Sequence, residues 1–175
     1  MESKIVAAEL IKVLNLYRNA LSDYTNTQFY YKQAEDIWSI GQMYEHLAVS
    51  ANYFFLKNIK YCLENRNGQM GGEMNANGEN AFKYNGFPPI KVKVPSRGPD
   101  PIAQDMKAYS IIFDNIIEQL KQQFLIISAN DGNYKTLHPV FGWHSAQEWL
   151  QSFEMHHRHH LRQKKELNGY LGIEK

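Results

Sequence analysis

The chain has 175 residues, of which 43% are hydrophobic and 21% are charged, and its formal net charge is +1. A chain of this length can bury a sizeable core by itself, so we expect a single domain over residues 1–175. The near-zero net charge argues against a nucleic-acid partner, because nucleic-acid binders carry a strong positive field. The sequence has no basic leader and no apolar run of about 18 residues, so we expect a cytoplasmic protein that enters no membrane.

Two helices are predicted in the first third of the chain. Apolar residues recur at steps of three and four over residues 5–21, as on one face of a helix of about five turns. A polar link over residues 25–37 leads to Ser39 and Gln42, whose spacing is that of a capping box. A second helix is therefore predicted over residues 40–64.

The chain has a single cysteine, Cys62, which lies in this second helix. One cysteine permits no intramolecular disulfide, and the chain is therefore compatible with a reducing cytosol. Because Cys62 is flanked by Tyr61 and Leu63, we expect it to be a small buried hydrophobic residue and not a reactive thiol.

A long connection separates the second helix from the third. Residues 65–99 are rich in glycine, proline and asparagine and show no sustained period beyond a short extended piece at 90–94. A connection of about 35 residues can run back along a bundle, and it would let the second and third helices lie parallel. Asp100 and Pro101 form a cap and first-position proline pair, which predicts that the third helix begins there and extends to about Phe124.

A second loop, residues 130–144, ends in another capping box, Ser145 with Glu148. The fourth helix is predicted from this box to about Leu171. Four amphipathic helices without a convincing set of strands predict an all-α fold, a four-helix bundle with a long crossover connection between helices two and three.

The fourth helix contains four of the seven histidines, all within the five-residue stretch 156–160. Residues four apart share a helix face, so His156 and His160 can both point at one ion. They lie on the stripe of the helix that aromatic residues mark as facing the core. His157 lies beside this stripe and His159 well round from it, and we assign these two to flanking or solvent roles. A His157 and His160 pair could also share a face.

The second helix offers a third inward histidine, His46. Whether it meets the pair depends on the axial offset between the two helices, which the sequence leaves open. Three neutral imidazoles leave a coordination position open on a divalent ion, as in catalytic zinc sites. We therefore expect His46, His156 and His160 to hold zinc or nickel, with iron or manganese also compatible, and to activate water or a thiol.

Two other metal motifs are disfavoured by the residues present. The zincin motif needs a glutamate directly after its first histidine, and that position is His157. A ferritin-like dinuclear site needs two Glu-x-x-His pairs in helices, and Glu154 with His157 supplies only one.

Three segments of the chain resemble the DinB/YfiT-like superfamily of bacterial four-helix proteins. They are residues 38–47 at the start of the second helix, residues 138–149 before and in the fourth helix, and residues 156–163 within it. The resemblance implies a metal on His46, His156 and His160. It also implies activation of a low-molecular-weight thiol such as bacillithiol, mycothiol or glutathione in some members, and metal-dependent hydrolysis in others.

Our leading hypothesis from the sequence is therefore a thiol-dependent S-transferase that acts on a small molecule at a three-histidine metal site. The alternatives are a metal-dependent hydrolase and a non-catalytic, stress-related interaction protein whose histidines are structural. Tyr44, Glu45 and Gln163 flank the proposed ligands and are candidates to support them or to contact a substrate, while the sequence identifies no catalytic acid or base. Eleven tyrosines favour a partner surface, with a homodimer as the simplest case.

Overall fold

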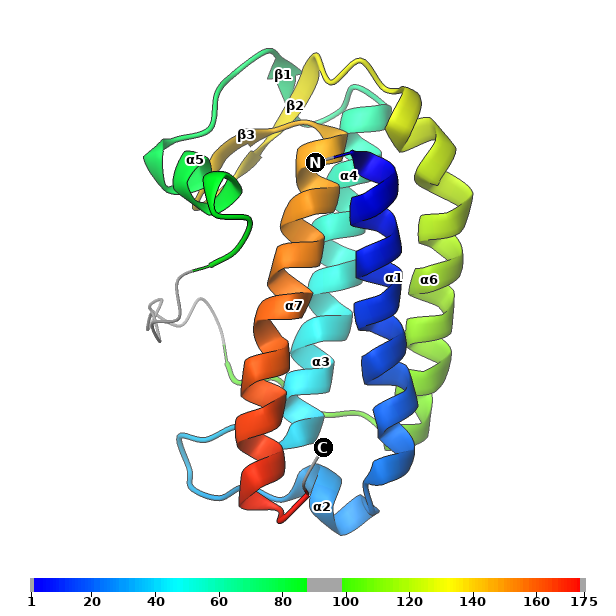
Figure 1. The fold of residues 1–175 in the computed structure, drawn as a ribbon, viewed down its shortest axis with the longest axis vertical. Helices are drawn as coiled ribbons and strands as arrows, with labels where there is room; N and C mark the ends of the chain where they lie inside the picture. The colour runs from blue at the N-terminus through cyan, green and yellow to red at the C-terminus, as the bar shows by residue number, and fades with distance from the viewer. Residues whose placement is uncertain (1, 88–98, 174–175) are drawn as a thin grey trace.

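Four long helical stretches lie side by side in the computed structural model, which describes residues 2–87 and 99–173 (Figure 1). They are α1 (Ser3–Ala20), the continuous run of α3 (Ile40–Ser50), η2 (Ala51–Leu56) and α4 (Lys57–Leu63), then α6 (Met106–Ala129), and α7 (Ala146–Tyr170). The helix α1 packs against both α6 and α7, and α3 also contacts these two helices. In Figure 1, α1 and α7 run in one direction, whereas α3–α4 and α6 run in the other. The second and third long helices are therefore parallel, as the long crossover predicts.

Both predicted capping boxes are present, and each fixes the start of a helix that carries candidate site residues. Ser39 Oγ accepts a hydrogen bond from the Gln42 backbone N–H at 3.1 Å, and Gln42 Oε1 accepts one from the Ser39 N–H at 3.0 Å. At the start of α7, Glu148 accepts from the Ser145 N–H at 2.7 Å, and Ser145 Oγ accepts from the Glu148 N–H. The second helix thus begins at residue 40 and the fourth at residue 146.

The second long helix contains a π-helical segment, η2, which the sequence did not predict. Two side-chain amides donate to backbone carbonyls around this segment: Asn52 Nδ2 donates to the Ala48 carbonyl at 3.1 Å and Asn58 Nδ2 to the Phe54 carbonyl at 2.8 Å. The extra residue per turn shifts the helix face, so that both Phe54 and Phe55 meet α7. Phe54 packs edge-on against Trp149, and Phe55 stacks on Phe153.

The predicted start of the third helix at Asp100 and Pro101 is wrong. The helix α6 begins at Met106, after Asp105, whose Oδ1 accepts a hydrogen bond from the Lys107 N–H at 3.0 Å. Asp100 precedes residues that are not helical, and its Oδ1 accepts a hydrogen bond from Trp38 Nε1 at 3.0 Å.

The connections contain short elements that the sequence analysis did not predict, including a small sheet. They are η1 (Leu21–Asp23), α2 (Asn26–Tyr30), β1 (Gln69–Met70), α5 (Ala76–Lys83), β2 (Tyr134–His138) and β3 (Gly142–His144). The three strands form an antiparallel sheet in the order β1-β2-β3, with Leu137 opposite Trp143. Strands of two to five residues are too short to show a reliable alternation of apolar and polar residues, and the sequence pattern therefore does not predict them. The expected extended piece at 90–94 lies outside the described residues.

The core lies between the four long helices and is rich in aromatic residues. Among its fully buried side chains are Tyr17, Phe29, Tyr44, Tyr109, Phe113, Trp149 and Phe153. Cys62 is buried, as predicted, with its Sγ 3.5 Å from Thr136 Oγ1 beneath the sheet. Within the described residues, every helix is too short or too polar to span a bilayer.

Candidate metal centre

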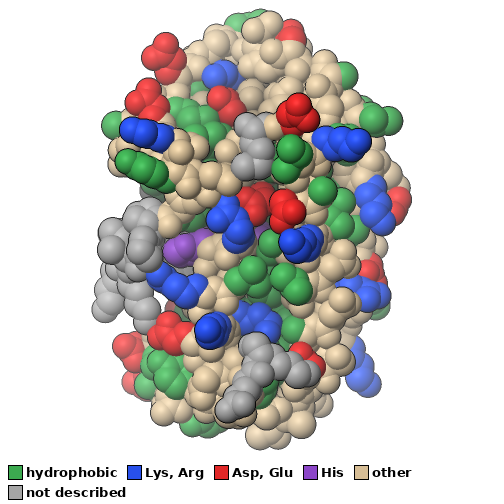
Figure 2. Space-filling view, in the orientation of Figure 1, with side chains coloured by type: hydrophobic (Ala, Val, Ile, Leu, Met, Phe, Trp, Pro, Cys, Tyr) green, Lys and Arg blue, Asp and Glu red, His purple; other side chains and the backbone are tan. Residues whose placement is uncertain are grey.

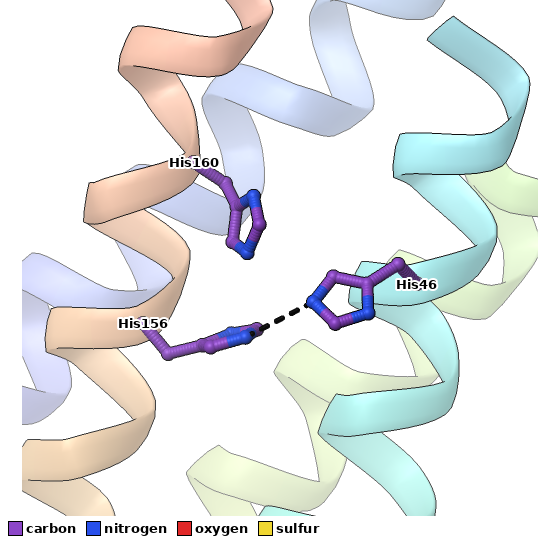
Figure 3. Close-up of side chains that lie close together, drawn as sticks. All are labelled: His46, His156 and His160. Carbon is purple, nitrogen blue, oxygen red and sulfur yellow. Dashed lines mark hydrogen bonds between the residues drawn. The ribbon is translucent and has the colours of Figure 1, made fainter. Parts of the chain in front are cut away.

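The structure brings His46, His156 and His160 together between α3 and α7. One ring nitrogen from each lies within 4.8 Å of the others. Figure 3 shows the His46 ring extending from α3 toward α7, where the His156 and His160 rings project from consecutive turns. The two helices are antiparallel, and their packing sets the axial offset that the sequence left open.

The distance between two of the ring nitrogens fits a tetrahedral transition-metal ion. His46 Nε2 and His156 Nε2 are 3.2 Å apart, the contact drawn as a dashed line in Figure 3. Two nitrogen ligands at about 2.0–2.1 Å from a tetrahedral zinc lie roughly 3.3 Å apart. The His160 ring centroid lies 4.8 Å from that of His46 and 4.7 Å from that of His156. With no ion, the 3.2 Å contact is a hydrogen bond in which one ring donates.

The three imidazoles are neutral near pH 7. Burial lowers the pKa of His46 to about 4 and that of His160 to about 3, since a buried ring loses the hydration that stabilises its charged form. Burial also holds the pKa of His156 well below its ordinary value, and the neighbouring histidines lower it further. Neutral rings have the lone pairs that metal binding requires, so no proton need leave the site at neutral pH.

Two neighbours contact the outer ring nitrogens of the group. Gln163 Oε1 lies 2.7 Å from His160 Nδ1. His157 Nδ1 lies 3.4 Å from His156 Nδ1 and 3.2 Å from the Phe153 carbonyl oxygen. His157 is fully buried and contacts His156, so its position is that of the flanking role, one of the two roles expected for it, and not that of a solvent-exposed residue.

The other residues considered in the sequence analysis, Tyr44, Glu45 and His159, lie outside the group of three histidines. Tyr44 is a core residue whose hydroxyl donates to the Tyr17 carbonyl at 2.7 Å. Glu45 faces α6, where its carboxylate accepts a hydrogen bond from the Tyr109 hydroxyl at 2.7 Å. His159 is half-buried, with its ring 5.6 Å from that of Phe87.

Two aromatic residues that sequence reasoning did not assign to the site line it. The Trp38 ring lies 5.3 Å from the His46 ring, and the Phe55 ring lies 5.2 Å from the His156 ring. Helical periodicity and capping spacing indicate which residues face the core, but they do not indicate which ring a side chain will meet. Together they give the histidines apolar neighbours, which favours neutral imidazole.

The face of the molecule shown in Figure 2 is mixed in charge. On the face in Figure 2, lysine and arginine side chains are interspersed with aspartate and glutamate, and only a small area of histidine is visible. Among the described residues, the three histidines form the one set of at least three His, Cys, Asp or Glu side chains spaced to hold an ion. A donor set of neutral nitrogens without carboxylate or thiolate suits zinc, nickel or another borderline divalent ion.

The fold and the histidine group define a four-helix bundle with a candidate three-histidine metal centre. Residues 9–163 match the DinB superfamily, and the chain belongs to that superfamily. A solved structure, that of YfiT from Bacillus subtilis, aligns with a TM-score of 0.66 at 17% identity, covering 98% of this chain and 88% of that chain. It is described as a probable metal-dependent hydrolase with an unusual four-helix bundle topology. A comparison with curated proteins found no match.

Proposed function

We propose that this DinB superfamily protein is a divalent-metal-dependent hydrolase in which His46, His156 and His160 hold the ion. The observation that supports this most is the convergence of three neutral imidazoles within 4.8 Å, with no acidic or thiol ligand among them. A divalent ion in such a donor set keeps its full charge and an open position, where it acts as a Lewis acid and lowers the pKa of water to about 7.

The protein side chains contribute position and environment. His46 comes from one rigid helix, and His156 and His160 come from another, so the donors are held by the packing of α3 against α7. Trp38 and Phe55 cover two of the rings and exclude water from those sides, which strengthens electrostatic interactions at the site. Gln163 accepts a hydrogen bond from His160 and orients its ring.

The hydrolase is preferred to the thiol-dependent S-transferase because the solved relative is described as a probable hydrolase. Both activities would use the same three histidines and differ only in the nucleophile, which is water in one and the thiolate of a small cofactor in the other. The choice of ion is the same for both, with zinc or nickel first and iron or manganese next.

Metal binding is tested on full-length protein purified without a histidine tag and incubated with zinc or nickel. We expect about one ion per chain by elemental analysis, and much less than one for each of His46→Ala, His156→Ala and His160→Ala. The control is His159→Ala, a neighbouring histidine outside the group, which should keep the ion. A wild-type protein that retains almost no ion would instead support the non-catalytic interaction protein.

Turnover is tested with a panel of ester and amide substrates, in the presence and absence of bacillithiol or glutathione. A hydrolase turns over without thiol and loses activity in the three histidine variants. Turnover that requires the thiol would overturn the hydrolase and support the S-transferase.

A further inference from the structure

The contact between Gln163 and His160 determines which nitrogen of His160 carries the proton. Gln163 lies one turn beyond His160 on α7, and its Oε1 is 2.7 Å from His160 Nδ1. An amide oxygen can only accept, so Nδ1 must carry the proton and Nε2 must carry the lone pair. In Figure 3 the far end of the His160 ring points toward the rings of His46 and His156. His160 therefore has its free lone pair directed into the group.

The rings of His46 and His156 do not both direct a free lone pair into the group. His46 and His156 share one hydrogen bond between their Nε2 atoms, so one of them carries a proton on the nitrogen that would face an ion. The outer nitrogen of His156 faces only His157 Nδ1, at 3.4 Å. The Gln163 contact is thus the shortest hydrogen bond made to an outer nitrogen of the group by the described residues.

We propose that Gln163 is a positioning residue that fixes the tautomer and orientation of His160 and thereby sets the metal affinity of the site. This inference rests on the proposed function, since it assigns Gln163 a role in holding the same ion. Residues that accept a hydrogen bond from a metal-bound histidine fix its ring and make it more basic, and their loss weakens metal binding about 10- to 100-fold.

A purely structural role for Gln163 is the competing explanation, because an i,i+3 hydrogen bond also supports a helix. Gln151 provides a matched control on the same helix. It is also partly buried, and its Nε2 donates a single side-chain hydrogen bond, to Asn85 Oδ1 at 3.2 Å. Removing this bond changes α7 packing without touching a histidine of the group.

The first measurement is zinc affinity by chelator competition on the untagged full-length protein. We expect Gln163→Leu to bind zinc about 10- to 100-fold more weakly, whereas Gln163→Glu, which keeps an acceptor, binds at least as tightly as the wild type. Gln151→Leu should bind zinc like the wild type. Equal affinity of wild type and Gln163→Leu, or an equal loss in both leucine variants, would overturn the inference.

The second measurement uses the metal-free protein and separates this inference from the metal site itself. Long-range ¹H–¹⁵N NMR spectra distinguish the two neutral imidazole tautomers, and His160 should be protonated on Nδ1 in the wild type and in Gln151→Leu. In Gln163→Leu the Nε2-protonated form should gain population. An unchanged tautomer in Gln163→Leu overturns the role of Gln163 even if zinc binds. A shifted tautomer in a protein that binds no zinc overturns the proposed function and leaves the hydrogen-bond assignment standing.

Discussion

His144 is a buried histidine outside the metal group, and it shows what burial does to an imidazole in this fold. Its ring is fully buried beneath the sheet, stacks on that of His138 at 5.2 Å, and has its Nε2 3.1 Å from Ser152 Oγ. Burial lowers the pKa of His144 to about 4. The native state therefore favours the neutral ring, while the unfolded chain titrates near the ordinary value of about 6.5.

The sign of the pH effect follows from these two values. Between pH 6.5 and pH 4 the unfolded state binds the proton and the native state does not, so the free energy of unfolding falls as the pH falls. For His144 the full loss is on the order of 3 kcal/mol, complete below about pH 4. Urea denaturation at pH 7 and pH 5 should show a smaller loss for His144→Asn than for the wild type. Equal losses in the two proteins would contradict this prediction, since the other buried histidines contribute to both.

At the scale of the element, the close packing at the start of α3 explains a glycine inside a helix. A Cβ on Gly41 would lie 2.8 Å from Ala103 Cβ and 2.8 Å from Phe29 Cε1. The small α2 helix and the segment before α6 therefore both approach the backbone of α3 directly. This approach holds the first turn of the helix that carries His46.

We predict that Gly41→Ala destabilises the protein, although alanine is the better helix former by about 1 kcal/mol. Overpacking of this kind has a penalty of about 1–3 kcal/mol, which should exceed the gain in propensity. Gly169→Ala, near the end of α7 with no atom within 4 Å of its added Cβ, should be neutral or stabilising. The two free energies of unfolding are measured by urea titration, and a stabilising Gly41→Ala would contradict the packing argument.

The elements that could be predicted from the sequence are those whose determinants are local. The capping boxes at Ser39 and Ser145 each fix a helix start through two residues that lie three apart, and both predicted helix starts are confirmed. The start of α6 was predicted wrongly: Asp100 and Pro101 have the local pattern of a helix start, but the helix begins after Asp105, and Asp100 bonds to Trp38, which lies 62 residues away in the sequence. The His156 and His160 pair follows from helical spacing alone, but its meeting with His46 depends on helix packing that no local pattern encodes.

At the scale of the whole molecule, an ion pair on α7 holds the crossover segment against the bundle. Arg158 donates to both oxygens of Glu154, at 2.7 and 3.0 Å, and also to the Asn85 carbonyl at 2.7 Å. Glu154 is only 5% exposed, and Arg158 pairs with its buried carboxylate. Asn85 has a φ of 47°, a left-handed conformation that asparagine tolerates, and it ends the segment containing α5.

We predict that Arg158→Ala loosens this attachment. Hydrogen exchange of the backbone amides in residues 76–87 should become faster, because the variant loses the tie to Asn85, while amides in the middle of α1 should be unchanged. Lys165→Ala, on the same exposed face of α7, is the control and should leave the exchange of residues 76–87 as in the wild type. Unchanged exchange in Arg158→Ala would show that the remaining contacts hold the segment.

The position of the three histidines along the chain also determines when the triad can form. His46 is separated by 110 residues from His156, so the triad can assemble only after α7 has left the ribosome and docked on α3. Before that moment, the closely spaced histidines of residues 156–160 can bind ions in the unfolded chain. An ion bound as proposed would stabilise the native state only by the difference between its affinities for the assembled triad and for that linear stretch. Loading of the proposed site would thus require that α7 has already docked on α3.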